Sequence, residues 1–132
     1  MSTKAALYSS EHEPPAEVHD TAELDTQLDK IAASCLPDRP TIVDLQVHRH
    51  SVSFGLGLPE TFVQIQSESG MPPYFITVGD SKAKGVVTYY LMGSHHTEIL
   101  RRYHISSALG REIVREFFVT GERPRQVEWE EA

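Results

Sequence analysis

The sequence lacks most of the features that staple small proteins covalently or anchor them in membranes. Its 132 residues include one cysteine, Cys35, which excludes an intramolecular disulfide. No apolar run approaches the roughly 18 residues that a membrane-spanning helix requires, and no segment resembles a secretory signal peptide. We therefore expect one domain, spanning residues 1–132, that works in the reducing cytoplasm and folds around its own hydrophobic core.

Basic residues are scarce as well. The chain has 12 Lys and Arg against 19 Asp and Glu, which gives a formal net charge of −7. Direct binding to nucleic acid requires a basic face, so this composition argues against it. The negative charge is concentrated in residues 1–30 and 120–132. A basic partner would suit such a protein, although solubility alone is a commoner reason for net charge.

Signatures of catalysis and metal binding are also missing. The histidines form only two close pairs, His48 with His50 and His95 with His96, whereas a zinc site needs three or four ligands. Cys35 falls on the apolar side of a predicted helix, where a thiol is usually inert. The sequence therefore predicts no metal and no cofactor.

The elements that the sequence does show form a simple series. Asp20 and Glu23 have capping-box spacing at the start of a helix predicted over residues 21–34, and a second amphipathic helix is predicted over 107–119. Five strand patterns lie between the helices: Thr41–His48, Ser51–Leu58, Thr61–Gln66, Tyr74–Val78 and Gly85–Met92.

Short connections between these strands favour antiparallel pairing, because parallel neighbours need long crossovers. We therefore predict an α+β fold, in which an antiparallel sheet of about five to six strands carries two main helices on one face. Residues 1–19 are expected to form a loose arm or a short edge strand. Tyr89-Tyr90 and Phe117-Phe118 are each expected to place one ring in the core and the other nearer the surface. Gly55-Leu56-Gly57 is expected to mark a bulge or a close backbone approach.

The C-terminal segment is the most informative part of the chain. Gly121 suits the left-handed position just past a helix, and Pro124 follows where the helix cannot continue. Val127 and Trp129 alternate with polar residues, which predicts a final strand with one buried face.

Several pieces of the sequence together resemble the type 1 immunity-protein family of bacterial polymorphic toxin systems. The resemblance covers about residues 50–130. Its pieces are the glycine-rich strand 54–57, the stretches 72–74 and 78–80, Tyr89-Tyr90 with Gly93, Glu98-Ile99, and the closing segment from Phe117 to Trp129.

This resemblance implies a non-enzymatic inhibitor. Members of the family are encoded beside a toxin, often one with a nucleic-acid deaminase domain, and bind it in the cytoplasm. The resemblance thus implies a one-to-one complex with a toxin domain whose active site is occluded, with no direct contact to nucleic acid or membrane. The free protein is expected to be a monomer, with a dimer as the alternative. Structural roles are implied for Gly79, Gly121, Pro124 and Trp129.

Loops on a rigid scaffold usually carry binding, which singles out polar and aromatic residues beside the best-matched strands. The expected toxin contacts are Glu68, Asp80, Tyr90, His95, His96 and Glu98. Asp80 has a competing role, because a Gly-Asp turn can use the carboxylate to hold its own backbone.

Two other functions stay open from the sequence. The first is a small ligand-binding domain or enzyme that uses a loop containing His95, His96 and Glu98, which a deep apolar pocket beside them would favour. The second is an oligomeric interaction protein whose exposed strand edge pairs with a copy of itself.

Overall fold

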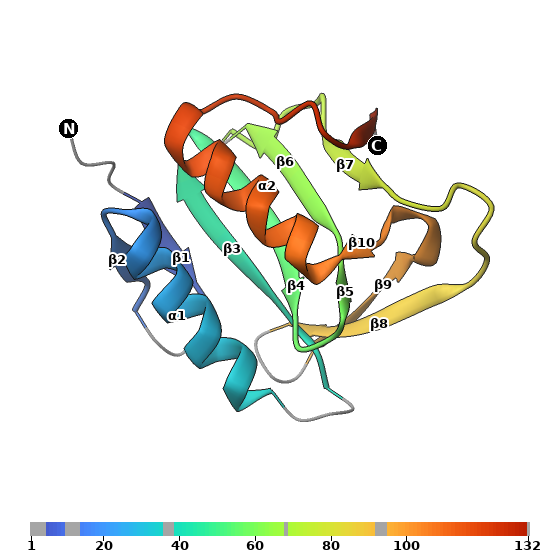
Figure 1. Cartoon of the computed structure of the whole chain (residues 1–132), viewed down its shortest axis with the longest axis horizontal. Helices are drawn as coiled ribbons and strands as arrows, with labels where there is room; N and C mark the ends of the chain where they lie inside the picture. The colour runs from blue at the N-terminus through green and yellow to red at the C-terminus, as the bar shows by residue number, and fades with distance from the viewer. Residues whose placement is uncertain (1–4, 10–13, 36–38, 68, 92–94, 132) are drawn as a thin grey trace.

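The computed structural model describes residues 5–9, 14–35, 39–67, 69–91 and 95–131 (Figure 1). These residues form two α-helices, a nine-stranded sheet and a separate two-stranded sheet, which confirms the predicted α+β class with more strands than expected. The helices are α1 (Thr21–Ser34) and α2 (Ser107–Thr120). The strands are β1 (Ala5–Tyr8), β2 (Ala16–Val18), β3 (Thr41–Val47), β4 (His50–Leu56), β5 (Glu60–Thr61), β6 (Val63–Ser67), β7 (Phe75–Val78), β8 (Val86–Leu91), β9 (His95–Leu100), β10 (Ile105–Ser106) and β11 (Glu128–Glu131).

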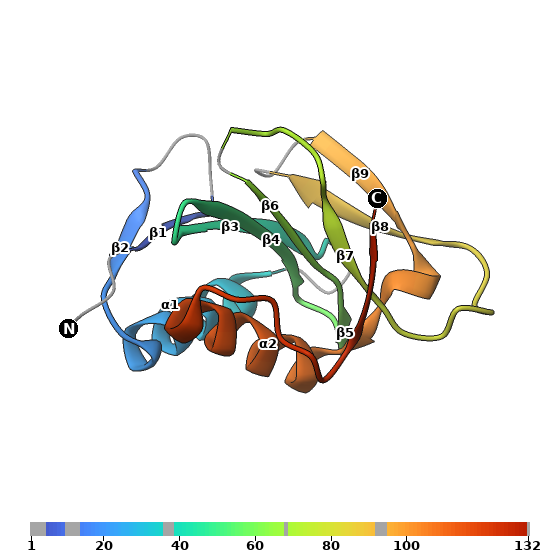
Figure 2. The same cartoon turned by 90° about the horizontal axis from the view of Figure 1, so that it is seen from above.

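The main sheet runs in the order β11-β7-β6-β4-β3-β1-β2, with antiparallel pairing between all neighbours along this path. Both helices cover one face of it, as the sequence predicts (Figure 2). The short edge strand expected within residues 1–19 is β2, whereas β1 lies inside the sheet, between β3 and β2. Within the described residues, no helix is both long and apolar enough to cross a membrane.

Local sequence signals set the ends of α1. The Asp20 carboxylate accepts a hydrogen bond of 2.8 Å from the backbone N–H of Glu23, as the capping-box spacing predicts. The reciprocal bond differs, because the Glu23 carboxylate accepts from the backbone N–H of His19 at 3.0 Å. Leu24 and Leu28 then point into the core.

Helix α2 begins at a serine cap and ends at a glycine. The Ser106 hydroxyl accepts from the N–H of Leu109 at 3.2 Å, and Gly121 adopts the left-handed conformation with φ 72°. Phe117 and Phe118 are both buried, so the prediction that only one ring is in the core is wrong. Successive helical residues lie about 100° apart, and a wide apolar stripe accommodates both rings.

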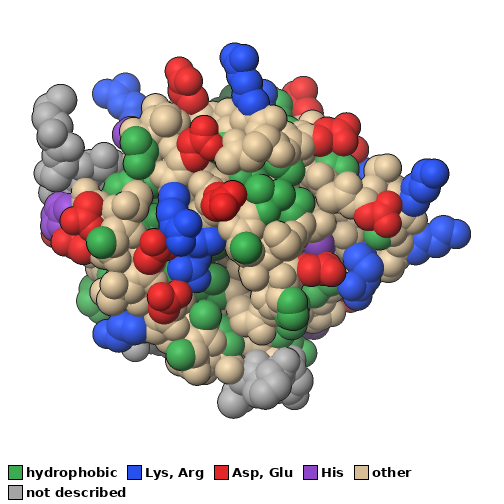
Figure 3. Space-filling model, in the orientation of Figure 1, with side chains coloured by type: hydrophobic (Ala, Val, Ile, Leu, Met, Phe, Trp, Pro, Cys, Tyr) green, Lys and Arg blue, Asp and Glu red, His purple; other side chains and the backbone are tan. Residues whose placement is uncertain are grey.

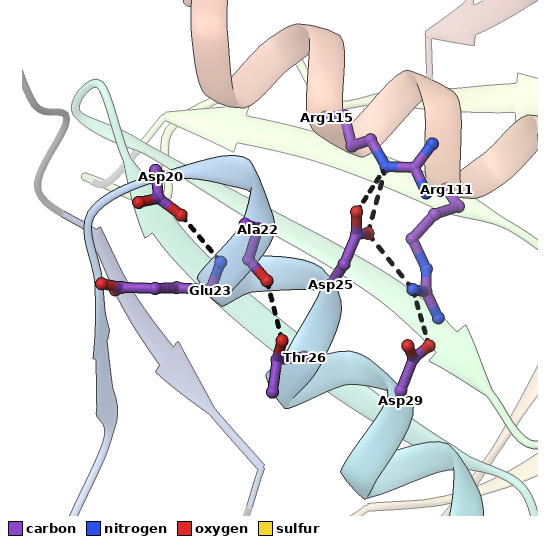
Figure 4. A network of polar contacts seen from close by, with 8 residues as sticks. All are labelled: Asp20, Ala22, Glu23, Asp25, Thr26, Asp29, Arg111 and Arg115. Atoms are coloured by element: carbon purple, nitrogen blue, oxygen red, sulfur yellow. Dashed lines mark hydrogen bonds and ion pairs between the residues drawn. The ribbon is translucent and has the colours of Figure 1, made fainter.

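An ion-pair network fastens the two helices to each other (Figure 4). The Asp25 carboxylate accepts from Nε of Arg115 at 3.0 Å and from Arg111 at 3.3 Å. Arg111 also donates to Asp29 at 3.0 Å. On this side of the molecule, acidic and basic side chains are interspersed (Figure 3), so the helix side does not present a surface of one charge.

The core has two parts, one on each face of the sheet. The larger part lies beneath the helices and includes Val43, Leu45, Val52, Phe54 and Val63. The smaller part lies on the opposite face and is formed by Ile42, Phe62, Ile76 and Tyr89. Tyr89 belongs to β8, so a β8–β9 hairpin covers part of the face that the helices leave open.

This hairpin is the main departure from the sequence-based prediction. Strand β8 joins the main sheet through a short parallel pairing with β3, in which Tyr90 lies opposite Thr41. Its antiparallel partner is β9, a strand that the sequence analysis treated as a loop. The expected close approach at Gly55 is confirmed, because a Cβ atom there would lie 2.4 Å from the Tyr89 ring.

Candidate functional site

Three of the predicted contact residues lie together on one face of the β8–β9 hairpin. Tyr90 is directly opposite His96 across the two strands, and Thr88 is opposite Glu98. Directly opposed residues of an antiparallel pair share a face, so Tyr90, His96 and Glu98 point the same way. The centroids of the Tyr90 and His96 rings are 6.5 Å apart.

Two apolar side chains extend the same face toward the base of the hairpin. Val86 and Leu100 are paired across the strands and are 41% and 44% exposed. We call the six residues Val86, Thr88, Tyr90, His96, Glu98 and Leu100 the outer hairpin face. It combines aromatic, aliphatic and polar side chains, and aromatic residues are enriched at protein interfaces.

Tyr90 is held in place within this face. The Arg39 guanidinium lies 4.8 Å from the centre of its ring, a distance that permits a cation–π contact. Its backbone N–H donates to the carbonyl of Pro40 at 2.8 Å, and its carbonyl accepts from the Thr41 hydroxyl at 3.0 Å. The aromatic ring is therefore presented from an ordered backbone.

The inner side of the hairpin is anchored by a buried tyrosine–histidine pair. The Tyr89 ring is fully buried and stacks on the His104 ring, with 5.8 Å between centroids. Nδ1 of His104 faces the carbonyl of Leu100 at 3.1 Å, so Nδ1 carries the proton. Nε2 then accepts from the Tyr89 hydroxyl at 2.9 Å.

Burial dominates the titration of both groups in this pair. It lowers the pKa of His104, because the charged imidazolium loses hydration, and it raises the pKa of Tyr89 for the corresponding reason. Both side chains are therefore neutral near pH 7. The sequence analysis did not single out His104, which the structure shows to be buried.

Asp80 lies apart from the outer hairpin face. Its carboxylate accepts from the backbone N–H of Lys82 at 3.0 Å, and its carbonyl accepts from Ala83 at 2.9 Å. The carboxylate thus holds the backbone of its own turn, which is the structural role expected from the sequence as an alternative to toxin contact. The residue borders a cavity of about 560 Å³ whose other lining residues include Glu60, Arg101 and His104.

The remaining predicted contacts, Glu68 and His95, are described only in part. Glu68 lies outside the described residues. His95 is paired with Leu91 in β9, while its side chain is outside the description. The prediction that His95, His96 and Glu98 belong to a loop is wrong, because all three lie in β9. One signal could have revealed this strand: Thr97 and Ile99 are β-branched and alternate with polar residues.

The predicted signature residues have visible packing roles. Gly79 donates its N–H to the carbonyl of Arg102 at 2.9 Å, and a Cβ atom at Gly79 would lie 1.8 Å from the His104 oxygen. Pro124 is buried and accepts a 2.7 Å hydrogen bond from the indole N–H of Trp129. Trp129 itself is half-buried against the helix-side core.

The described cavities give little support to a ligand site at His96 and Glu98. A cavity of about 520 Å³ lies between the helices and the β4–β5 connection, and Arg111 and Asp29 are among its lining residues. A second, of about 440 Å³, reaches the hairpin at Val86 and Thr88. Neither cavity is lined by His96 or Glu98. Among the described residues, no cluster of three His, Cys, Asp or Glu side chains could hold a metal ion.

Two comparisons of the sequence with known proteins bear on the family of this chain. A search of curated protein sequences found no match. The sequence model of the immunity protein Imm1 matches residues 12–131, which is nearly the whole chain and includes both helices and the β8–β9 hairpin. The chain therefore belongs to the Imm1 immunity-protein family.

Proposed function

We propose that this protein is a non-enzymatic inhibitor that binds one cognate toxin domain per chain and occludes the active site of that domain. We further propose that the outer hairpin face is its principal contact surface. The observation that carries this proposal is the convergence of Tyr90, His96 and Glu98 on one solvent-facing strand pair. This convergence occurs in a chain of an immunity-protein family.

The construction of the hairpin supports a binding role. Its inner side is fixed by the buried Tyr89–His104 pair, so the outer side chains are presented from a rigid support. A preorganised surface loses less conformational entropy on association. Tyr90 is the natural anchor, because tyrosine is enriched among the residues that dominate binding energies.

Among the described residues, the potentially reactive side chains of Cys35 and His104 are engaged in packing, which supports binding rather than catalysis. The Cys35 thiol lies 3.4 Å from the carbonyl of Ile31, and burial raises its pKa. His104 is buried, and both of its ring nitrogens are hydrogen-bonded.

The partner that we propose is a nucleic-acid deaminase domain in the cytoplasm of the producing cell. An enzyme that acts on nucleic acid needs a basic approach to its pocket. An inhibitor with a net charge of −7 would be attracted to such a surface over long distances. The outer hairpin face itself carries one carboxylate, Glu98, so long-range attraction and short-range contact have different origins.

A protection assay in cells tests this proposal. The chain is co-expressed with the toxin domain encoded by the neighbouring reading frame, and survival is measured for the wild type and for Tyr90→Ala with Glu98→Lys. Glu112→Lys is the matched control, because Glu112 is an exposed acid on α2, on the other side of the sheet. We expect the hairpin variant to lose protection and the control to retain it. Death of the wild-type cells at the toxin-only rate would refute the immunity function, and equal protection by both variants would refute the assigned surface.

A further inference from the structure

In the described residues the main sheet branches at β3, which pairs with β1, β4 and β8, so three strands lie at its edges: β2, β9 and β11. These edge strands differ in how well they are protected against pairing with another chain. Exposed edges invite such pairing unless short length or charge opposes it. Strand β2 has three residues, and β11 carries Glu128, Glu130 and Glu131 among its four. Strand β9 has six residues with one carboxylate, and within the described residues it pairs only with β8.

The backbone of β9 is arranged so that alternate residues face this open edge. The N–H of Arg101 donates to the carbonyl of Gly85 at 3.0 Å, one step beyond the Val86–Leu100 pair. Odd-numbered residues of β9 therefore direct their backbone groups toward β8. The even-numbered residues His96, Glu98 and Leu100 direct theirs outward. The backbone of Tyr90, which lies opposite His96, fits this alternation, because its N–H points away from β9 and donates to the carbonyl of Pro40.

We propose that a second copy of this chain pairs with this edge, with the two β9 strands antiparallel about a two-fold axis at Thr97. The backbone phase requires even-numbered residues to lie opposite even-numbered residues. An axis at Thr97 places His96 of each copy opposite Glu98 of the other. The imidazole N–H can then donate to the carboxylate twice, once on each side of the axis.

Neighbouring registers are less favourable. An axis at Glu98 places the two carboxylates opposite each other, which is destabilising in an antiparallel pair. An axis at His96 places two imidazoles opposite each other and removes the carboxylate from its partner. The register at Thr97 also brings the two threonines together on the inner side of the hairpin, and threonine pairs across strands are stabilising.

This dimer extends the sheet and takes His96 and Glu98 of each outer hairpin face into contacts between the two copies, while Val86, Thr88 and Tyr90 of each chain stay outside those contacts. It does not depend on the identity of the toxin. Both of its tests use the full-length chain alone, and their failure would leave the proposed function untouched.

The first test measures molecular mass by sedimentation equilibrium over a wide range of protein concentration. We expect the mass to rise from that of one chain to that of two. Replacing His96 with Glu sets two pairs of like charges opposite each other, and we expect this to weaken the dimer by at least about tenfold. A wild-type chain that stays monomeric throughout the range would overturn the proposal, as would a His96→Glu dimer of unchanged strength.

The second test fixes the register by disulfide trapping in a Cys35→Ala background. At the axis, the two Thr97 Cα atoms form a non-hydrogen-bonded pair about 4.5 Å apart, within the range of about 4.4–6.8 Å that a disulfide spans. Thr97→Cys should therefore give a covalent dimer on mild oxidation. Glu98→Cys is the control, because its diagonal separation of about 7–8 Å is too long. Equal or faster crosslinking of the control would overturn the register, and with it the proposed dimer.

Discussion

His104 shows how one buried side chain ties the hairpin to the rest of the molecule. Its imidazole bridges Tyr89 of β8 and the carbonyl of Leu100 at the end of β9. Because the folded state holds this ring neutral, the histidine makes stability depend on pH.

We expect this dependence to appear below the pKa of an unfolded histidine, about 6.5. The pKa of folded His104 is lowered, so the unfolded chain binds the proton first as pH falls. The stabilisation is complete above about pH 6.5 and declines as pH falls from there toward the folded pKa. Urea unfolding at pH 7.5 and 5.5 checks this. The stability difference between wild type and His104→Gln should be smaller at the lower pH.

His19 does not confound that comparison. Hydrogen bonds that its ring donates to the Glu17 and Glu23 carboxylates raise the pKa of His19, which gives the opposite pH dependence, but His19 is present in both proteins. A difference that stays constant or widens on acidification would contradict the neutral, buried assignment of His104.

Trp129 closes the C-terminal segment onto the sheet. Its indole N–H binds the carbonyl of Pro124, and the Arg123 guanidinium lies 5.9 Å from its ring. Trp129→Ala should lower the free energy of unfolding by about 3 kcal/mol, the lower end of the range for a buried tryptophan, because the ring is half-buried.

Thermal and urea unfolding measure this loss, with Trp129→Phe as the control that keeps a ring but removes the N–H donor. We expect the control to lose clearly less stability than the alanine variant. The emission of the wild-type tryptophan should be shifted to the blue of free indole. Emission like that of free indole, with an alanine variant as stable as wild type, would show that Trp129 is exposed and does not stabilise the fold.

At the scale of elements, the contact between α1 and α2 depends on one carboxylate more than on its neighbour. Asp25 is 30% exposed and binds both Arg111 and Arg115, whereas Asp29 is 72% exposed and binds Arg111 alone. Asp25→Ala should cost about 1 kcal/mol, after allowance for solvent screening, and Asp29→Ala less than about 0.5 kcal/mol. Urea unfolding of the two variants at low salt checks the order, which a reversed ranking would contradict.

The elements that the sequence predicted well are those fixed by local signals. The start of α1 follows from the Asp20 cap, and the end of α2 follows from Gly121. Strand β8 was predicted as Gly85–Met92, but its partner β9 was missed, and so was its parallel contact with β3, which joins Thr41 and Tyr90, far apart in sequence. The polar residues of β9 face solvent and therefore resembled a loop.

In the candidate site, too, the sequence indicated individual residues but not their arrangement in space. Sequence alone selected Tyr90, His96 and Glu98, but their common face follows from the cross-strand register. Asp80 was selected by the same reasoning, and the structure gives it a turn of its own. The roles of Val86 and Leu100 were not visible, because an exposed apolar residue in a strand looks the same in sequence as a buried one.

For the whole molecule, the net charge of −7 should affect the rate of toxin binding more than the lifetime of the complex. We expect the association rate constant to fall steeply as salt rises from 20 to about 300 mM, because the Debye length shortens from about 20 Å to under 10 Å. The dissociation rate should change little. Stopped-flow or surface binding measurements give both rates, and a salt-independent association would show that the charge does not steer the encounter.

The central claim is that the outer hairpin face binds a cognate toxin domain. Titration calorimetry with the purified, catalytically inactivated toxin domain tests it most directly, for wild type, Tyr90→Ala and Glu112→Lys. We predict one toxin domain per chain, a loss of about 2 kcal/mol or roughly 30-fold in affinity for Tyr90→Ala, and nearly unchanged affinity for Glu112→Lys. Tight binding that is insensitive to Tyr90→Ala but abolished by Glu112→Lys would place the interface on the helices and contradict the account.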